Sequence, residues 1–188
     1  MQAALLRLVL GAALLPAAAV RADEATDPKV ALPVLLKVVT YDRNFAARGS
    51  REFVLLVASE PAQQALRAEL LSTLKGLKLS SIHNRTLRLV EVEFKDQAFL
   101  DAKVQSERAS AILAVPGLSG AGLTAVSEVA MDNQIYTLAL DQAMAEKSLA
   151  IAVTVKDGRP QIVINQTAAK GIGAVFESSV LKLARVVQ

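Results

Sequence analysis

The sequence predicts a three-layer α/β/α domain with a mixed, mostly parallel sheet of about six strands. Strand-like and helix-like segments alternate four times along the chain, which indicates parallel strands joined by helical crossovers. Two of the strand-like segments are continuous apolar runs, typical of strands buried on both faces. The last two strand-like segments of the chain flank Asp157-Gly158, a turn signal that predicts a closing antiparallel hairpin.

The first 22 residues have the features of a cleaved signal peptide. A short start with one positive charge precedes an uncharged apolar run from Leu8 to Leu15, and small residues mark a cleavage site after Ala22, with an alternative after Ala19. The run is shorter than the roughly 20 residues that span a membrane. The sequence therefore predicts an exported, periplasmic chain whose mature part, residues 23–188, forms one domain.

A helix is predicted at the start of the mature chain. Asp27 supplies a capping carboxylate, and Pro28 suits the first helical position. Apolar residues then recur with a helical period as far as Phe45, and Gly49 is placed to end the helix. The segment Tyr41-Asp42-Arg43-Asn44 falls late in this helix, and we interpret it as an anchor for the turn into the first strand.

Strands and helices alternate through the next hundred or so residues. Uninterrupted apolar residues predict buried strands at 52–58 and 110–115, whereas the segment 86–94 alternates apolar with charged residues and belongs nearer an edge. A fourth strand is predicted at 134–140. The predicted helices between and after these strands are 59–74, 96–108, 122–132 and 141–147.

The closing hairpin would join strands 150–156 and 161–165, and a final helix is expected to run to Val187. Gly171 and Gly173 lie in that last segment and each lowers helix stability by roughly 1 kcal/mol relative to Ala. We therefore expect the helix to start late or to pack closely against a neighbour. Its expected buried face consists of Phe176, Val180, Leu183 and Val187.

The composition excludes several classes of site. The 188 residues include no Cys and one His, which excludes disulfides, a thiol nucleophile and multi-histidine zinc sites. The 21 Lys and Arg exceed the 18 Asp and Glu by 3, but Arg7 and Arg21 leave with the signal, so the mature chain has 19 basic and 18 acidic residues. Nucleic-acid binding needs clustered positive charge. We expect no metal, no cofactor and no nucleic-acid partner.

The case for catalysis rests on one loop. A hydrolase could use Ser81 and His83, but the chain lacks the Gly-x-Ser-x-Gly elbow that exposes a nucleophilic serine. The loop precedes a strand, so it belongs at the amino edge of the sheet, opposite the usual ligand crevice. The glycine-rich segment 117–122 matches neither a dinucleotide fingerprint nor a P-loop, and we interpret it as a turn. We assign no catalytic residue and expect a protein that is not an enzyme.

A small-ligand site is easier to place. In an open α/β sheet, ligands bind at the carboxyl ends of the strands. This rule gives five candidate residues for a ligand crevice: Ser59, Lys95, Gly117, Ser119 and Asp141.

The two ends of the mature chain carry a family resemblance. Residues 161–170 (Gln-Ile-Val-Ile-Asn-Gln-Thr-Ala-Ala-Lys) and 176–186 (Phe-Glu-Ser-Ser-Val-Leu-Lys-Leu-Ala-Arg-Val) resemble the end of YfiR-like periplasmic proteins, and 35–44 is similar to the opening helix of one branch. The middle matches that family only in its order of strands and helices. The motif residues look structural, as a strand end, a cap and a core helix face: Ile164, Asn165, Ala168, Ala169, Leu181, Leu183 and Ala184.

The resemblance implies an exported, non-enzymatic regulator that binds the periplasmic domain of a membrane signalling protein, such as a diguanylate cyclase, and restrains cyclic-di-GMP production. Any membrane contact would come through that partner or an uncleaved signal, and homo-oligomerisation stays open. Disulfide control, known in some members, is excluded because the chain has no Cys. A periplasmic small-ligand binding module is the alternative. A regulator should expose an apolar patch of several hundred Å², and a ligand binder should have a closed pocket of roughly 300–1,000 Å³.

Overall fold

The computed structural model describes residues 26–48 and 51–188. The predicted signal peptide and Gly49 lie outside these residues. The strands, in chain order, are β1 (Glu52–Ser59), β2 (Ser81–Ile82), β3 (Arg85–Glu93), β4 (Ala111–Ala114), β5 (Tyr136–Ala139), β6 (Ile151–Lys156), β7 (Arg159–Asn165) and β8 (Ala184–Val187). The helices are α1 (Pro28–Val38), α2 (Gln64–Gly76), α3 (Gln97–Glu107), α4 (Gly120–Asn133), α5 (Gln142–Lys147), α6 (Gln166–Gly171) and α7 (Ser178–Leu181), with the short 3₁₀ turns η1 (Val39–Tyr41) and η2 (Pro61–Gln63).

All eight strands form one mixed sheet in the order β2-β3-β1-β4-β5-β6-β7-β8. Strands β3, β1, β4, β5 and β6 are parallel, β2 and β7 run antiparallel to their inner neighbours, and β8 is parallel to β7. The predicted α/β/α class is confirmed. The sheet has two strands more than the six expected, and both additions, β2 and β8, are edge strands.

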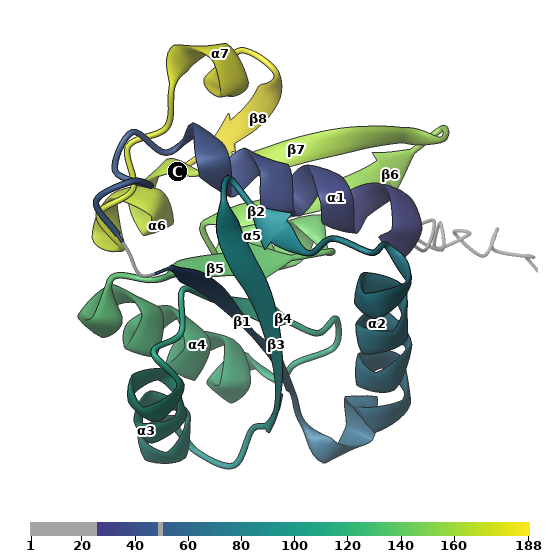
Figure 1. Ribbon diagram of the computed structural model, residues 1–188, viewed down its shortest axis with the longest axis vertical. Helices are drawn as coiled ribbons and strands as arrows, with labels where there is room; N and C mark the ends of the chain where they lie inside the picture. Colours follow the sequence, from purple (N-terminus) through teal and green to yellow (C-terminus); the bar gives the residue numbers. More distant parts are fainter. Residues whose placement is uncertain (1–25, 49–50) are drawn as a thin grey trace, which may run out of the picture.

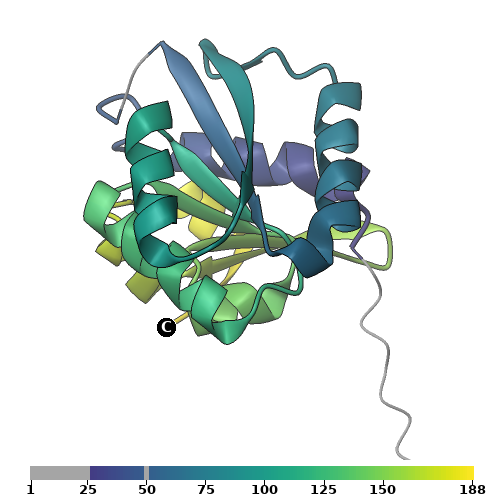
Figure 2. The ribbon, with the colours of Figure 1, turned by 90° about the horizontal axis from the view of Figure 1, so that it is seen from below.

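The helices cover both faces of the sheet (Figures 1 and 2). The connection through α2 moves from β1 to one side, whereas those through α3, α4 and α5 step toward the other side. Because such crossovers are right-handed, α2 lies on one face and α3, α4 and α5 lie on the other. Helix α1 packs against α2, β6 and β7 and so completes the first face. None of the described helices is long and apolar enough to cross a bilayer.

The core lies along the central strands. Every residue of β1 from Phe53 to Ser59 is buried, and so are all four residues of β4, as the continuous apolar runs predicted. Burying a side chain of this kind contributes about 1.5–3 kcal/mol. Since the chain has no Cys, this packing holds the domain together without covalent cross-links.

The first helix is shorter than predicted. Asp27 caps it as expected, with its Oδ1 accepting a 2.9 Å hydrogen bond from the Lys29 N–H. The helical pattern through Phe45 was misleading, because η1 follows α1 and the backbone turns extended at Asp42. The Asp42 carboxylate accepts the Asn44 N–H at 3.0 Å, which favours a turn over further helix. Phe45 is still buried, but from this turn, where its ring stacks 6.1 Å from that of Phe53.

The predicted final helix is wrong. The chain forms the separate short helices α6 and α7 and then β8, which pairs with β7. Gly173 has φ +71°, a left-handed backbone that ends the helical path, and the β-branched Val186 and Val187 fit a strand. Gly171 ends α6 beneath Met131, whose sulfur lies 3.0 Å from the position of an added Cβ. The expectation that a glycine in this segment allows close packing against a neighbour is therefore met at Gly171.

The family-motif residues divide into two groups. Ile164 and Ala169 are buried, and Asn165 caps α6 by accepting the Ala168 N–H at 2.9 Å, so the strand end and cap are confirmed. Leu181 and Ala184 pack partly buried against the core. Leu183 is 77% exposed, and its assignment to a buried helix face is wrong because the chain there is entering an edge strand.

Candidate functional site

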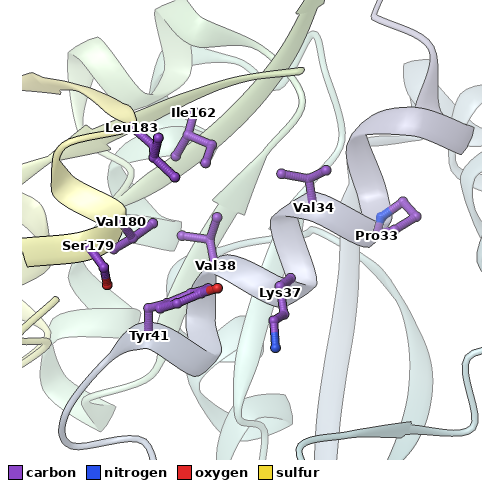
Figure 3. A pocket seen from close by; sticks show the side chains of 9 residues that line it. All are labelled: Pro33, Val34, Lys37, Val38, Tyr41, Ile162, Ser179, Val180 and Leu183. Atoms are coloured by element: carbon purple, nitrogen blue, oxygen red, sulfur yellow. The ribbon is translucent and has the colours of Figure 1, made fainter. Parts of the chain in front are cut away.

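An apolar groove of about 410 Å³ lies between α1 and the C-terminal segment (Figure 3). One wall comes from α1 and η1, the other from α7 and the residues that lead into β8, and β7 forms part of the floor. Helix α1 packs against β6 and β7, and the groove opens beside it over β7 and the residues that lead into β8. The lining residues are Pro33, Val34, Lys37, Val38, Tyr41, Ile162, Ser179, Val180 and Leu183.

The α1 wall follows from helical spacing. Val34, Lys37, Val38 and Tyr41 recur at intervals of three and four residues and therefore share one helix face. Val38 is buried in the core, whereas Pro33, Val34 and Tyr41 are only partly buried. These three side chains supply the apolar surface that α1 and η1 expose in the groove.

Lys37 is the charged residue of the lining. Its Nζ lies 5.6 Å from the centre of the Tyr41 ring, a cation–π arrangement at the groove rim. Tyr41 and Ser179 add hydroxyl groups, and no carboxylate lines the groove. The groove therefore matches a molecule with an apolar body and an anionic group.

The groove combines features of the two surfaces predicted from the sequence, the ligand pocket of a binding module and the apolar patch of a regulator. Its volume falls within the range of roughly 300–1,000 Å³ typical of ligand sites. It is open, however, because its wall residue Leu183 is 77% exposed, and Val186 nearby is 43% exposed. Exposed apolar side chains of this kind are expected of a surface that docks a partner.

One buried carboxylate fixes the end of the groove next to Tyr41. Asp42 is 3% exposed, and its Oδ2 accepts a 2.6 Å hydrogen bond from the Tyr136 hydroxyl and lies 2.9 Å from Arg48 Nε. Its Oδ1 accepts the Val175 N–H at 2.7 Å. Burial raises the pKa of Tyr136, and the hydrogen bond to Asp42 raises it further, so this hydroxyl stays a proton donor.

Further hydrogen bonds tie the same loop to the C-terminal segment. The Arg48 guanidinium donates to the Ile172 carbonyl at 2.7 Å, and the Asn44 side chain donates to the Gly173 carbonyl at 3.0 Å. Glu177 N–H donates to the Tyr41 carbonyl at 2.9 Å. We call the contacts of residues 41–48 with 172–177 the Asp42 clamp. The clamp sets the position of Tyr41 relative to the opposite wall.

The predicted crevice residues lie at the carboxyl edge of the sheet. The switch point lies between β1 and β4, since the chain goes from β1 toward β3 on one side and from β4 toward β5 on the other. Ser59, at the end of β1, is fully buried, and its Oγ accepts a 3.1 Å hydrogen bond from Arg67. Gly117, after β4, accepts a 2.9 Å hydrogen bond from the Gln63 side chain through its carbonyl.

The N-terminus of α4 is occupied by a side chain of the protein itself. Ser119 caps this helix, its Oγ accepting the Gly122 N–H at 3.1 Å. Glu60 accepts hydrogen bonds from the Ser119 hydroxyl and, at 3.3 Å, from the Ser119 N–H. A carboxylate is thus already bound where the glycine-rich segment would hold an anion. This agrees with its interpretation as a turn.

The other two crevice candidates also have structural partners. Lys95 Nζ lies 5.1 Å from the centre of the Phe99 ring. Asp141 caps α5, with its Oδ1 accepting the Ala143 N–H at 2.8 Å. The Phe94 N–H donates to the Ser59 carbonyl at 2.7 Å, which brings Lys95 to the same edge as Ser59. The five candidates therefore share an edge, while a ligand role for them stays a prediction.

The loop with Ser81 and His83, the candidate residues of a hydrolase, forms a hairpin turn between β2 and β3. His83 has φ 47° and sits edge-on to Phe45, with ring centres 5.6 Å apart. No hydrogen bond joins Ser81 to His83 in the described part of the chain. Across residues 26–48 and 51–188, no group of three His, Asp or Glu side chains is arranged to hold a metal ion.

Sequence reasoning missed the groove. The spacing of Val34, Lys37, Val38 and Tyr41 was the available signal, because it puts apolar residues on a second stripe of α1. The opposite wall was hidden by the predicted final helix. A strand at 184–187 moves Leu183 from the core to the rim of the groove.

Comparisons with known proteins identify the fold and no family. No protein-family model matches the chain, and no curated protein is similar to it in sequence. Several solved structures are similar in fold, among them three from bacteria. A conserved domain protein from Vibrio cholerae O1 biovar El Tor has a TM-score of 0.56 and 15% identity over 84% of this chain and 58% of that one.

One of the other two structures holds L-Trp, and the other is described as a substrate-binding protein. An ABC domain from Streptococcus pneumoniae in complex with L-Trp has a TM-score of 0.59 and 12% identity over 87% of this chain and 62% of that one. A ligand-free, open substrate-binding protein with adhesive properties from Clostridium difficile has a TM-score of 0.58 and 12% identity over 77% and 57%. The chain thus spans about three-fifths of each of these proteins. At these identities the likeness shows the fold alone, an α/β fold also found in substrate-binding proteins.

Proposed function

We propose that this chain is an exported, non-enzymatic binding protein whose groove takes a small molecule with an apolar body and an anionic group. The observation that carries the proposal is the groove itself, an apolar surface with Lys37 as its one charged lining residue. A site of this volume with few polar groups is the usual form of a small-molecule site. The fold shared with a substrate-binding protein and with an ABC domain in complex with L-Trp supports the same class.

L-tryptophan is a suitable first probe because the chain contains no Trp, so the fluorescence of the bound amino acid reports binding directly. We expect the groove variant Val34→Glu to lose binding, because it places a charge on an apolar wall. Lys37→Gln should weaken binding of the carboxylate about five-fold, the effect of roughly 1 kcal/mol for an exposed ion pair. Tryptamine lacks the carboxylate and keeps the ammonium group, so Lys37→Gln should not weaken its binding.

The control variant is Lys29→Gln, which removes an exposed lysine from α1 outside the groove. A panel of indole, phenyl and branched-chain carboxylates that gives no response would overturn the proposal. Retained binding in Val34→Glu together with loss in Ser119→Ala would move the site to the carboxyl edge, where the five crevice candidates lie.

A second candidate function is that of a YfiR-like regulator of a membrane signalling protein. The exposed Leu183 and Val186 beside the groove favour it, since apolar side chains on the surface suit a protein partner. The test is affinity purification of the mature chain from the native host, with cyclic-di-GMP measured after deletion of its gene. Recovery of no membrane receptor, with unchanged cyclic-di-GMP, would exclude this function.

Export itself can be tested on the same preparations. If residues 1–22 are a signal peptide, the mature protein begins at Asp23 and is recovered in the periplasmic fraction. N-terminal sequencing that begins at Met1 would contradict this.

A further inference from the structure

The two edges of the sheet differ in how they are protected. Strand β3 pairs with the two-residue strand β2 at Arg85 and Thr86, and its Leu87 N–H donates to the Ser80 carbonyl at 3.0 Å. Beyond Leu87, no strand of the described structure pairs with this outer edge. That edge carries Arg88, Glu91 and Glu93, the kind of charged side chains that prevent strands from pairing edge to edge.

Strand β8 forms the opposite edge and has little such protection. It reads Ala184-Arg185-Val186-Val187, and its one charge is paired, since Arg185 lies 2.8 Å from Glu146 of α5. Val186 is 43% exposed, and Leu183 just before the strand is 77% exposed. An apolar edge with free backbone groups is a template for another strand.

The groove lies beside this edge on the sheet face that α1 covers. Ile162 on its floor pairs in register with Ala184 of β8, so the two side chains lie on the same face. Because the side chain of Ala184 is only a methyl group, it does not block access from the β8 edge to Ile162. A long apolar side chain on a strand added next to β8 can therefore reach over Ala184 into the groove.

The lysines around this edge favour a partner segment with acidic side chains. Lys37 at the groove rim and Lys182 just before β8 are exposed, and within the described ranges neither is ion-paired with a carboxylate. Pairing of β8 with a second copy of itself would bring the unpaired Lys182 of each copy to one shared edge, and like charges brought together across strands are destabilising. Acidic side chains on an incoming strand would be favoured instead.

We propose that β8 receives an extended segment of another protein as a ninth strand, with one large apolar side chain in the groove and an acidic residue against Lys37 or Lys182. The proposal deepens the second candidate function, on which it rests, by naming the partner's contact segment. It does not depend on whether a small molecule also binds the groove. If one does, the molecule and the anchoring side chain compete for the same volume.

Peptide selection gives the test. A random peptide library is selected against the folded mature chain, and the best binders are synthesised and measured by calorimetry. We expect sequences with alternating apolar residues and an acidic flank. Val186→Lys and Leu183→Asp should weaken binding at least about tenfold, the loss of roughly 1.4 kcal/mol typical of a central interface residue. The control Met131→Lys, which removes an apolar side chain 39% exposed on α4, should bind normally.

Backbone methylation separates strand addition from other modes of docking. Each peptide is made in two forms, N-methylated at alternate amides in one phase or the other. In an added strand, alternate N–H groups face the edge, so one form should lose binding and the other should keep it. Equal binding of both forms would overturn strand addition.

Three further outcomes are decisive. Selection of no binder, or of binders unaffected by Val186→Lys, overturns the proposal. Sedimentation showing that the chain dimerises, with the dimer lost in Val186→Lys, would assign the edge to a second copy instead. If a membrane receptor co-purifies equally with the unmodified chain and with Val186→Lys, the regulator function stands and the strand-addition proposal fails.

Discussion

Replacing Asp42 by Ala should be among the most destabilising single changes in this protein. The side chain of Asp42 is fully buried, and that of Arg48, 2.9 Å away, is 13% exposed. Removal of the carboxylate leaves the Arg48 cation without its counter-ion, and the Tyr136 hydroxyl and the Val175 N–H without their acceptor. Breaking a buried pair by removing one partner costs about 3–5 kcal/mol.

The matched control is an ion pair of nearly the same length on the surface. Arg185 and Glu146 lie 2.8 Å apart, but their side chains are 57% and 38% exposed. Exposed pairs contribute about 0–1 kcal/mol. Glu146→Ala should therefore lower the free energy of unfolding by less than about 1 kcal/mol, although the distance in the two pairs is almost equal.

The assay is urea unfolding of the mature chain at neutral pH, followed by circular dichroism, with hydrogen exchange measured on the same variants. A loss near the total stability of a typical domain, about 5–15 kcal/mol, would leave Asp42→Ala partly unfolded. Asp42→Asn keeps an acceptor for Val175 and gives a smaller loss, about 1.5–3 kcal/mol, from the lost charge-assisted hydrogen bonds. Exchange should increase first at residues 172–177.

A loss in Asp42→Ala no larger than that in Glu146→Ala would refute this reasoning. So would unchanged exchange protection at residues 172–177 in Asp42→Asn. Either result would mean that the clamp does not hold the C-terminal segment in place.

Two further predictions concern the same core and the start of α4. The pKa of Tyr136 is raised in the folded protein. The tyrosine therefore stabilises the folded state fully below the ordinary tyrosine pKa of about 10, and this stabilisation is lost as the pH rises above that value, because the unfolded chain then releases the proton first. Tyr136→Phe should flatten the fall in unfolding free energy between about pH 9 and 11, and a fall of unchanged slope would contradict the assignment. Gly122→Ala should cost about 1–3 kcal/mol, because its Cβ would lie 2.5 Å from Leu118 Cδ2 and 2.9 Å from Glu60 Oε1. Gly120→Ala meets no atom within 4 Å and should be neutral or stabilising, up to about 1 kcal/mol, by thermal unfolding; equal costs at the two glycines would refute the steric argument.

Local signals predicted most of the fold. Asp27 caps α1 as predicted, because capping depends on residues two or three positions apart. Asp96, Ser119 and Asp141 cap the helices α3, α4 and α5, which begin within two residues of their predicted starts. The buried strands β1 and β4 were equally visible as apolar runs. These features need no knowledge of distant parts of the chain.

The groove could not be predicted, because distant contacts decide it. The four-residue spacing of Phe176 and Val180 suits a helix, and nothing nearby shows that the backbone at Phe176 bridges Asp42 instead. Asp42 and Val175 are 133 positions apart. A prediction that lacks this contact places Leu183 on the buried face of a helix and therefore contains only one wall of the groove.

The same separation in sequence has a kinetic consequence. Closing a loop of that length costs entropy before the clamp can form, so contacts between residues 41–48 and 172–177 belong late on the folding route. Interactions absent from the transition state act on the unfolding rate. Asp42→Asn should therefore speed unfolding and leave the refolding rate nearly unchanged in stopped-flow experiments. The groove would then be the last part of the domain to be assembled and the first to be lost, so it could open and close many times during the lifetime of the folded sheet.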